Sequence, residues 1–224
     1  MNGVQTKSKI FIVDDHPMVR EALKIRISIE PDMEICGNAE TENEAFEKIG
    51  LCEPDLVLVD ISLKQGNGIS LVKQLLARNS ELRILVFSMH AESLYAERAF
   101  RAGALGYLNK QESPDQVTYA IRTVLEGRKF FSAAINQRLS NQALGENQES
   151  ENPVKKLSDR ELEVFQLIGQ GLTTAEAAKR MGISVHTVDT YRQKIKVKIG
   201  VKNGPELQRE AVRWVIEQAQ DKQD

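Results

Sequence analysis

Short apolar runs alternate with segments of helical periodicity along the first half of the chain. The run Asp55–Asp60 holds four consecutive apolar residues, too few for a helix, which is typical of a strand buried on both faces of a sheet. Pro17 suits the first turn of a following helix. The predicted strands are Lys9–Asp14, Met33–Ala39, Asp55–Asp60, Arg83–Ser88 and Gly106–Asn109, and the predicted helices are Pro17–Ile29, Glu42–Leu51, Ile69–Ala77, Ala91–Ala102 and Pro114–Glu126. This order predicts an α/β fold, a doubly wound five-stranded parallel sheet with helices on both faces.

The last third of the chain shows only helical patterns. Ser158 and Glu161 stand three residues apart ahead of an apolar pattern, as in a capping box. The predicted helices run from the capping residue Ser158 to Gly171, over Thr174–Met181, from the capping residue Ser184 to about Ile199, and from Pro205 to about Ala219. A turn at Gly182-Ile183 separates the second helix from the third. The pattern predicts a small all-α domain of four helices that includes a helix-turn-helix.

A polar segment separates the two patterns. Ser140–Pro153 contains one Leu and one Ala among polar, Gly and Pro residues, so it cannot bury enough apolar area to offset its ordering entropy. Residues 1–152 hold 17 basic and 22 acidic side chains, a balance of −5, whereas the remaining residues hold 13 and 10, a balance of +3. Chance could also produce this swing. We expect an α/β domain at 8–127, a linker at 128–154 and a helical domain at 155–219.

Composition excludes several classes of protein. Hydrophobic residues make up 41% of the 224 residues and charged residues 28%, which fits packed domains better than a disordered chain. No apolar run approaches the roughly 18 residues that span a bilayer, and the first residues lack the apolar stretch of a secretory signal. Cys36 and Cys52 are too few for a disulfide framework or a four-ligand zinc site. We expect a cytoplasmic protein with no membrane partner.

Polar side chains stand at the carboxyl ends of four predicted strands. Asp14 and Asp15 come at the end of the first strand, Asp60 of the third, Ser88 of the fourth and Lys110 of the fifth. Because ligands of parallel sheets bind outside the carboxyl ends of the strands, we expect these side chains to converge on one edge. Clustered carboxylates repel one another unless a cation lies among them, and oxygen ligands suit Mg²⁺. A facing lysine and hydroxyl offer partners for an incoming phosphoryl group.

These strand ends, together with the block GALGYLNK at 103–110, resemble the receiver domain of bacterial two-component response regulators over residues 8–127. The resemblance implies a flavodoxin-like fold, a Mg²⁺ cofactor and a set of matched residues: the phosphoacceptor Asp60, the Mg²⁺ ligands Asp14, Asp15, Asp60 and the backbone carbonyl of Ser62, the phosphate-binding Lys110, and the switch residues Ser88 and Tyr107. Gly68 also matches the family pattern. Lys64 stands where the family often has proline, which changes loop stiffness but no ligand.

The resemblance also implies a mechanism. Asp60 would attack the phosphoryl group carried by the histidine of a sensor kinase, while Mg²⁺ and Lys110 neutralise charge on the transferring oxygens. The new group carries roughly −1.5 to −2 charges, so nearby donors rearrange toward it. We expect Ser88 to move inward and Tyr107 to rotate into the vacated space. This chemistry modifies the protein itself, so we expect a phosphoprotein and not an enzyme.

The C-terminal helices resemble the four-helix DNA-binding domain of the LuxR type over about residues 155–216. The likeness rests on LSDRELEVFQLIGQGLT at 157–173, AAKRMGISVHTV at 177–188 and KIGV at 198–201. Joined to a receiver, it defines the NarL/FixJ group, which implies phosphorylation-controlled regulation of transcription. The implied partners are a sensor histidine kinase and double-stranded promoter DNA, with a homodimer after phosphorylation and RNA polymerase as a further candidate. One side of the last helix offers Leu207, Ala211, Trp214 and Val215 as core or dimer contacts.

The helix capped by Ser184 is the one expected to read DNA. At about 100° per residue, Val188, Ile195 and Ile199 share one side and should face the core. The candidate base contacts are His186, Thr190, Gln193 and Val197, flanked by Asp189 and Lys194, and the candidate phosphate contacts are Arg192, Lys194, Lys196 and Lys198. Asp189 and Tyr191 differ from the lysine and histidine often found in the family, so the DNA sequence that relatives prefer should not be transferred.

Three other interpretations compete with this one. A phosphohydrolase with an aspartyl nucleophile would usually carry a second acid two residues later, but here Ile61-Ser62 follows Asp60. A LuxR regulator that senses a small molecule would need a ligand-binding front domain, which fits the five-strand alternation poorly. A receiver that works without a kinase would not need the complete acidic set.

Overall fold

The computed structural model describes residues 7–143 and 153–220 of the chain, which divides into two compact units, Met1–Glu146 and Asn147–Asp224. Each unit buries its own set of apolar side chains. Among the described residues, no helix has both the length and the apolar composition that crossing a bilayer requires.

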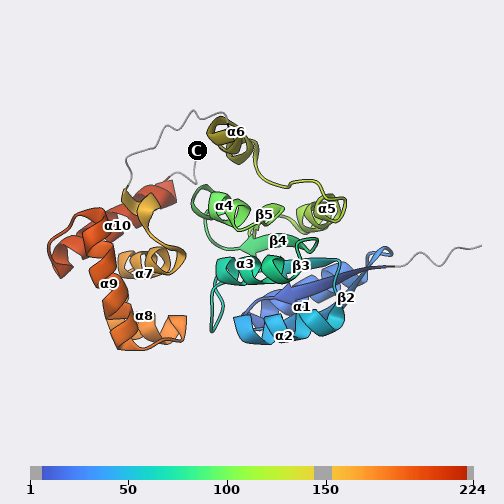
Figure 1. The fold of residues 1–224 in the computed structure, drawn as a ribbon, viewed down its shortest axis with the longest axis horizontal. Helices are drawn as coiled ribbons and strands as arrows, with labels where there is room; N and C mark the ends of the chain where they lie inside the picture. The colour runs from blue at the N-terminus through green and yellow to red at the C-terminus, as the bar shows by residue number, and fades with distance from the viewer. Residues whose placement is uncertain (1–6, 144–152, 221–224) are drawn as a thin grey trace, which may run out of the picture. The chain divides into compact units, whose positions relative to one another are not determined.

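The N-terminal unit is built on one parallel sheet (Figure 1). Its strands are β1 (Ser8–Val13), β2 (Met33–Ala39), β3 (Leu56–Val59), β4 (Arg83–Ser88) and β5 (Gly106–Asn109), and its first helices are α1 (Pro17–Ser28), α2 (Glu42–Cys52), α3 (Gly68–Arg78), α4 (Glu92–Arg101) and α5 (Pro114–Leu125). The strands lie in the order β2-β1-β3-β4-β5, so the strand order reverses between β1 and β3. Ligands bind at such a switch point. The predicted fold class is confirmed.

Helices cover both faces of this sheet. On one face, Leu23 of α1 and Ile121 of α5 pack in the same apolar cluster as Leu58 of β3. On the other face, α2, α3 and α4 contribute buried side chains such as Val72 and Tyr95. Because β3 and β4 are covered on both sides, their sequences read as nearly continuous apolar runs.

A short extended segment follows α5 and lies along the outer edge of β5. Phe130 forms a parallel bridge with Gly106 there, and the Tyr107 N–H donates to the Phe130 carbonyl oxygen at 2.8 Å. Because β5 is the last strand in the order, these bonds satisfy backbone groups that an open edge would leave unpaired. The edge of β5 is therefore covered over part of its length.

Helix α6 (Ala133–Ala143) then packs on α4. The Phe131 ring meets the Phe100 ring edge-on at a centroid distance of 5.8 Å, and Ile135 is buried. We expected residues 128–154 to form a linker, so this helix is a difference from the sequence analysis. Its physical reason is that Phe131 and Ile135 give the segment an apolar face to bury. Residues 144–152 of the expected linker lie outside the described part of the chain.

The C-terminal unit consists of helices whose limits follow the sequence pattern closely. They are the short 3-10 turn η1 (Pro153–Lys156) and the helices α7 (Asp159–Gly169), α8 (Thr174–Met181), α9 (Val185–Ile199) and α10 (Gly204–Gln220). The predicted capping box is present: the Ser158 side chain accepts from the Glu161 N–H, and the Glu161 carboxylate accepts from the Ser158 N–H at 2.7 Å. Both hydrogen bonds satisfy backbone N–H groups at the start of α7 that have no partner within the helix.

Helices α7 and α10 pack closely because Gly169 has no side chain. A Cβ at this position would lie 2.4 Å from the Ala211 carbonyl oxygen. Leu207, Ala211 and Trp214 are buried within the unit, and Val215 is half-buried. Three of the four α10 residues offered as core or dimer contacts therefore serve the core of this domain.

Candidate functional site

The predicted polar strand ends meet at the carboxyl edge of the sheet. Asp14 follows β1, Asp60 follows β3, Ser88 ends β4 and Lys110 follows β5. Backbone hydrogen bonds extend the sheet to this edge, since the Asp60 N–H donates to the Val13 carbonyl at 2.8 Å and the Lys110 N–H to the Ser88 carbonyl at 2.9 Å. The parallel register thus brings together side chains that lie far apart in the sequence.

The Lys110 ammonium group bridges two buried carboxylates. Its Nζ lies 2.6 Å from Oδ2 of Asp14 and 2.6 Å from Oδ2 of Asp60, and all three side chains are between 2% and 4% exposed. Oδ1 of Asp60 and the Ser88 hydroxyl are also buried, and among the described residues neither has a hydrogen-bond partner. Buried polar atoms without partners are costly, so these two indicate a ligand that completes the site.

The negative charges at this edge outnumber the positive ones. Burial raises the pKa of Asp14 above its usual value, the Asp60 carboxylate raises it further, and Lys110 opposes both effects. Burial also raises the pKa of Asp15, against the lowering effect of His16. A further negative charge here is therefore unfavourable, and a divalent cation with a preference for oxygen ligands would relieve the repulsion.

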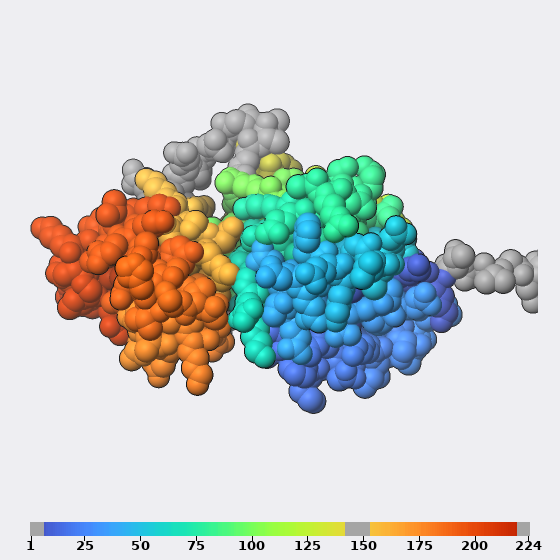
Figure 2. All heavy atoms as spheres, turned by 60° about the horizontal axis from the view of Figure 1, so that its bottom comes forward, coloured from blue at the N-terminus to red at the C-terminus, as the bar shows by residue number. Residues whose placement is uncertain are grey.

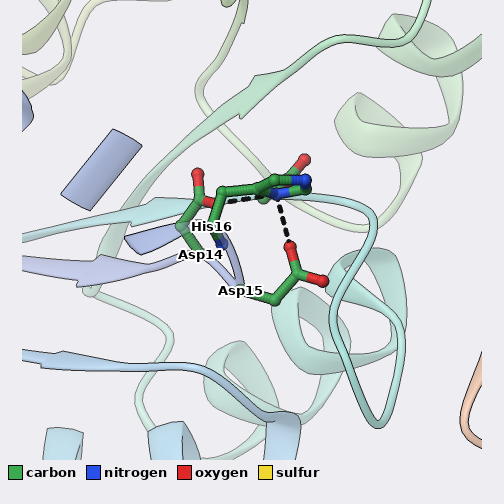
Figure 3. Close-up of side chains that lie close together, drawn as sticks. Asp14, Asp15 and His16 are labelled. Carbon is green, nitrogen blue, oxygen red and sulfur yellow. Dashed lines mark hydrogen bonds and ion pairs between the residues drawn. The ribbon is translucent and has the colours of Figure 1, made fainter. Parts of the chain in front are cut away.

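His16 joins the acidic edge, although the sequence analysis did not single it out. Its Nδ1 lies 2.6 Å from Oδ1 of Asp15 and 3.5 Å from Oδ1 of Asp14 (Figure 3). One ligand atom from each of Asp14, Asp15, His16 and Asp60 lies within 4.8 Å of the others. The position of His16 directly after two aspartates is the signal that could have identified it.

Arg20 supports the loop that carries the first two aspartates. Its Nη1 donates to the Asp14 carbonyl oxygen at 2.7 Å, and its Nη2 donates to Oε1 of Glu40 at 2.5 Å. The other Glu40 oxygen lies 4.0 Å from Nζ of Lys64, the residue that departs from the family pattern. The buried guanidinium therefore links the loop after β1 to the loop after β2, with Lys64 of the loop after β3 close by.

The loop after Asp60 is held close to the acidic edge. A Cβ at Gly68 would lie 2.0 Å from the Asp60 carbonyl oxygen, so a side chain there would push the start of α3 away. Oγ of Ser62 and Nε2 of His90 lie 2.8 Å apart and connect this loop to the loop after β4. The family resemblance implied a role only for the backbone carbonyl of Ser62, and His90 was not predicted to lie at this edge.

Tyr107 lies inside the unit. Its side chain is 2% exposed, and its hydroxyl donates to the His90 carbonyl oxygen at 2.9 Å. Asn109 Nδ2 donates to the same oxygen at 3.0 Å. Burial raises the pKa of Tyr107 well above its usual value, so the hydroxyl stays protonated as a donor. The Tyr107 ring is thus buried in this structure and hydrogen-bonded to the loop after β4.

Helix α9 presents most of the predicted DNA contacts on its outer side. His186, Asp189, Thr190, Gln193, Lys194 and Val197 are exposed, whereas Arg192 and Lys196 are half-buried. Figure 2 shows this segment, in orange, at the surface of its unit. Val188 and Ile195 are buried and Ile199 is half-buried, as the helical spacing predicted. The Thr190 hydroxyl donates to the His186 carbonyl oxygen at 3.0 Å, which leaves its oxygen free to accept.

Lys198, one of the expected phosphate contacts, also has a partner within the domain. Its Nζ lies 2.6 Å from Oε2 of Glu161, the carboxylate that caps α7. The lysine therefore joins α9 to α7 within the domain. The turn before α9 has the expected form: Gly182 ends α8 with a left-handed φ of 64°, and the Ser184 side chain accepts from the Thr187 N–H at 3.0 Å.

Two family models match the chain. Residues 10–122 match the response regulator receiver domain, and residues 155–211 match the luxR family of bacterial regulatory proteins. The oxygen regulatory protein NreC of Staphylococcus aureus is 34% identical over 204 residues, which cover 89% of this chain and 94% of that protein. The chain belongs to the NarL/FixJ group of response regulators. Both parts of the resemblance, the receiver domain and the LuxR-type DNA-binding domain, are thereby confirmed.

Solved structures share the fold of this response regulator. A two-component response regulator of the LuxR family from Aurantimonas sp. SI85-9A1 is 33% identical with a TM-score of 0.57, and the match covers 62% of this chain and 99% of that one. RcsB from Salmonella enterica serovar Typhimurium, solved on promoter DNA with the phosphomimetic BeF3−, is 22% identical with a TM-score of 0.62. That match covers 92% of this chain and 98% of RcsB.

Proposed function

We propose that this response regulator takes up a phosphoryl group on Asp60 and thereby controls how its C-terminal domain binds promoter DNA. The observation that carries the proposal is the Lys110 ammonium between Asp14 and Asp60, beside a buried Asp60 oxygen that no described residue hydrogen-bonds. That oxygen is available as a nucleophile, and the ammonium can hold an oxygen of the incoming group. The buried Ser88 hydroxyl, which has no hydrogen-bond partner among residues 7–143 and 153–220, offers a second donor.

The transfer step changes only two bonds. A carboxylate oxygen of Asp60 attacks the phosphorus of a phosphohistidine on a sensor kinase, so an O–P bond forms as the N–P bond breaks. The kinase imidazole leaves with the bonding electron pair. Lys110 can move its hydrogen bond from Asp60 to a transferred oxygen, which keeps its positive charge beside the developing negative charge. The protein itself is the product, which supports a phosphoprotein switch over an enzyme with turnover.

We infer that Mg²⁺ is the cofactor of this step. The carboxylates of Asp14, Asp15 and Asp60 and the backbone carbonyl of Ser62 would hold it. The raised pKa values of Asp14 and Asp15 support this inference, because a divalent cation removes the repulsion that contributes to them. When bound, Mg²⁺ neutralises negative charge on the transferring oxygens.

Labelling with acetyl phosphate tests the acceptor. We expect the wild-type protein in Mg²⁺ to gain one phosphoryl group by intact mass, and Asp60→Asn to gain none because its nucleophile is gone. Asp15→Asn should need more Mg²⁺ for the same labelling. Asp55→Asn is the matched control, since Asp55 lies at the other end of β3, where it accepts from the Lys9 N–H at 2.8 Å. Labelling of Asp60→Asn at the wild-type rate in the same segment would refute the acceptor role.

We propose that the signal leaves the site through Ser88 and Tyr107. A phosphoryl group on Asp60 would attract the Ser88 hydroxyl, for which the described part of the chain supplies no hydrogen-bond partner. The Tyr107 hydroxyl ties β5 to the loop after β4 through the His90 carbonyl, and β5 in turn is bonded to Phe130 ahead of α6. A shift at Ser88 would therefore reach α4, β5 and α6 together.

We propose that α9 enters the major groove of promoter DNA and that the phosphorylated protein binds as a homodimer. Base edges would be read by His186, Asp189, Thr190 and Gln193, and phosphates would be contacted by Arg192, Lys194 and Lys196. One helix-turn-helix covers too little DNA for strong specificity, so paired half-sites are expected. A sensor histidine kinase and RNA polymerase complete the proposed partners, and regulation of promoters places the action in the cytoplasm.

Analytical ultracentrifugation of free and phosphorylated protein, with and without a selected DNA site, tests the dimer. We expect phosphorylation to shift the protein toward a dimer and the DNA complex to contain two protomers. A DNA complex that keeps strictly one protomer per site would contradict the dimer while leaving the acceptor assignment intact.

A further inference from the structure

A nitrogen atom lies among the oxygens of the acidic edge. Nδ1 of His16 is 2.6 Å from Oδ1 of Asp15 and 3.5 Å from Oδ1 of Asp14 (Figure 3). Two ligand atoms that are each about 2.1 Å from one metal ion, at right angles, lie about 3.0 Å apart. The two observed separations lie on either side of this value, and the ligand atoms of all three side chains lie within 4.8 Å of one another, so side-chain rotations would bring them around one ion.

Three further observations favour a site over a simple surface ion pair. The Asp60 side chain is 3% exposed, belongs to the same group of ligand atoms, and has a buried oxygen without a partner among the described residues. The His16 side chain is 59% exposed, so an ion can reach Nδ1 from solvent. The His16 N–H donates to Oδ1 of Asp14 at 2.9 Å, which fixes the turn that holds the ring beside the acids.

We propose that this edge binds a divalent transition-metal ion, with His16 Nδ1 as a nitrogen ligand beside the carboxylates, in competition with Mg²⁺. Mg²⁺ prefers oxygen ligands and would leave the imidazole unused, whereas Ni²⁺ and Zn²⁺ bind imidazole and hold mixed nitrogen and oxygen sites more tightly. An ion held by His16 would occupy the carboxylates that phosphoryl transfer needs. The inference rests on the metal site of the proposed function and concerns which ions that site accepts.

Calorimetric titration of the full chain with Ni²⁺ and with Mg²⁺ tests the role of His16. The titrations use a Cys36→Ser/Cys52→Ser background, so that thiols do not bind the metal. We expect His16→Asn to weaken Ni²⁺ binding at least about tenfold, because even residues that only support a metal ligand cost 10–100-fold when lost. Mg²⁺ affinity should stay within about twofold, since Mg²⁺ uses the oxygens. His186→Asn, on α9, is the control and should leave Ni²⁺ binding unchanged.

Equal losses for both metals, or no loss of Ni²⁺ affinity, would show that His16 makes an exposed ion pair only. If His16→Asn does not fold, the wild-type protein still decides, because it has only three histidines. Paramagnetic Co²⁺ should shift the NMR ring signals of His16 far more than those of His90 and His186, and excess Mg²⁺ should reverse the shift. Shifts centred on His90, or shifts that Mg²⁺ cannot reverse, would overturn the proposal. Failure of Asp60 labelling in Mg²⁺ would sink the proposed function and leave these metal results standing.

Discussion

Replacement of Lys110 by glutamine should destabilise the receiver domain by several kcal/mol. The ammonium is 4% exposed and lies 2.6 Å from a carboxylate oxygen of Asp14 and 2.6 Å from one of Asp60. Its removal leaves two buried carboxylates facing each other without a cation. Breaking a buried pair by removing one partner costs about 3–5 kcal/mol, and uptake of a proton by one carboxylate limits the loss, so we expect about 3 kcal/mol at neutral pH.

Lys24→Gln is the matched control for this experiment. Lys24 Nζ pairs with Glu21 at 2.8 Å on the surface of α1, where such a pair contributes under about 1 kcal/mol. Urea unfolding followed by circular dichroism reports on both domains, whereas fluorescence of the single tryptophan, Trp214, reports on the C-terminal domain. Lys110→Gln should shift the receiver transition to lower urea and leave the Trp214 transition in place.

Three comparisons separate the electrostatic effect from a packing effect. The loss should shrink from about pH 7 to about pH 5, because a carboxylate then takes up the proton that replaces the missing cation. In an Asp60→Asn background, Lys110→Gln should cost less, since Asp14 alone remains unpaired. Mg²⁺ should restore part of the lost stability. A loss for Lys110→Gln no larger than that for Lys24→Gln, or equal losses in both backgrounds, would rule out an electrostatic origin.

Three further predictions concern other parts of the protein. Burial raises the pKa of Asp14, so the charged carboxylate lowers the stability of the folded domain above the folded-state pKa and has no such effect below the ordinary value of 3.8. Asp14→Asn should therefore raise the free energy of unfolding in urea most at neutral pH, and this increase should vanish near about pH 4. Gln193→Ala should reduce the DNA sequence preference at one base pair by about 1–3 kcal/mol and leave the salt dependence of binding unchanged. Lys196→Ala should weaken binding to all DNA sites alike and lower the slope of log affinity against log salt by about one per protomer. Titration of single-base DNA variants at two salt concentrations checks both, and the reverse pattern would show that α9 is oriented differently. Ser158→Ala removes the cap of α7 and should lower the free energy of unfolding of the C-terminal domain by about 1 kcal/mol, as measured by Trp214 fluorescence in urea. An unchanged unfolding midpoint would show that the cap does not stabilise this domain.

The fold and the acidic edge were predictable because they depend on pattern and register. The apolar run of β3 is too short for a helix, and parallel strands bring their carboxyl ends to one edge. Asp14, Asp60 and Lys110 could therefore be grouped before any contact was known. Helix α6 was missed because its stability depends on burial of Phe131 and Ile135, and the partner of Phe131, the Phe100 ring of α4, lies in a distant segment.

Pairings between individual side chains were the other feature that the sequence could not predict. The pairing of Lys198 with Glu161 of another helix, at 2.6 Å, could not be read from a count of charges. His90 meets Ser62 across two loops, at a sequence distance of 28 residues. Such partners depend on rotamers and on the packing of whole elements, which a single sequence does not display.

The segment from Phe130 through α6 determines where this receiver domain can be separated from the rest of the chain. A fragment that stops at residue 127 would leave the Phe100 ring without Phe131 and the edge of β5 without Phe130. An open strand edge beside exposed aromatic surface invites strand-to-strand association between copies. A fragment that runs through residue 143 keeps both covers in place. Aggregation of the shorter fragment would thus reflect a missing piece of its own fold and would say nothing about the proposed dimer.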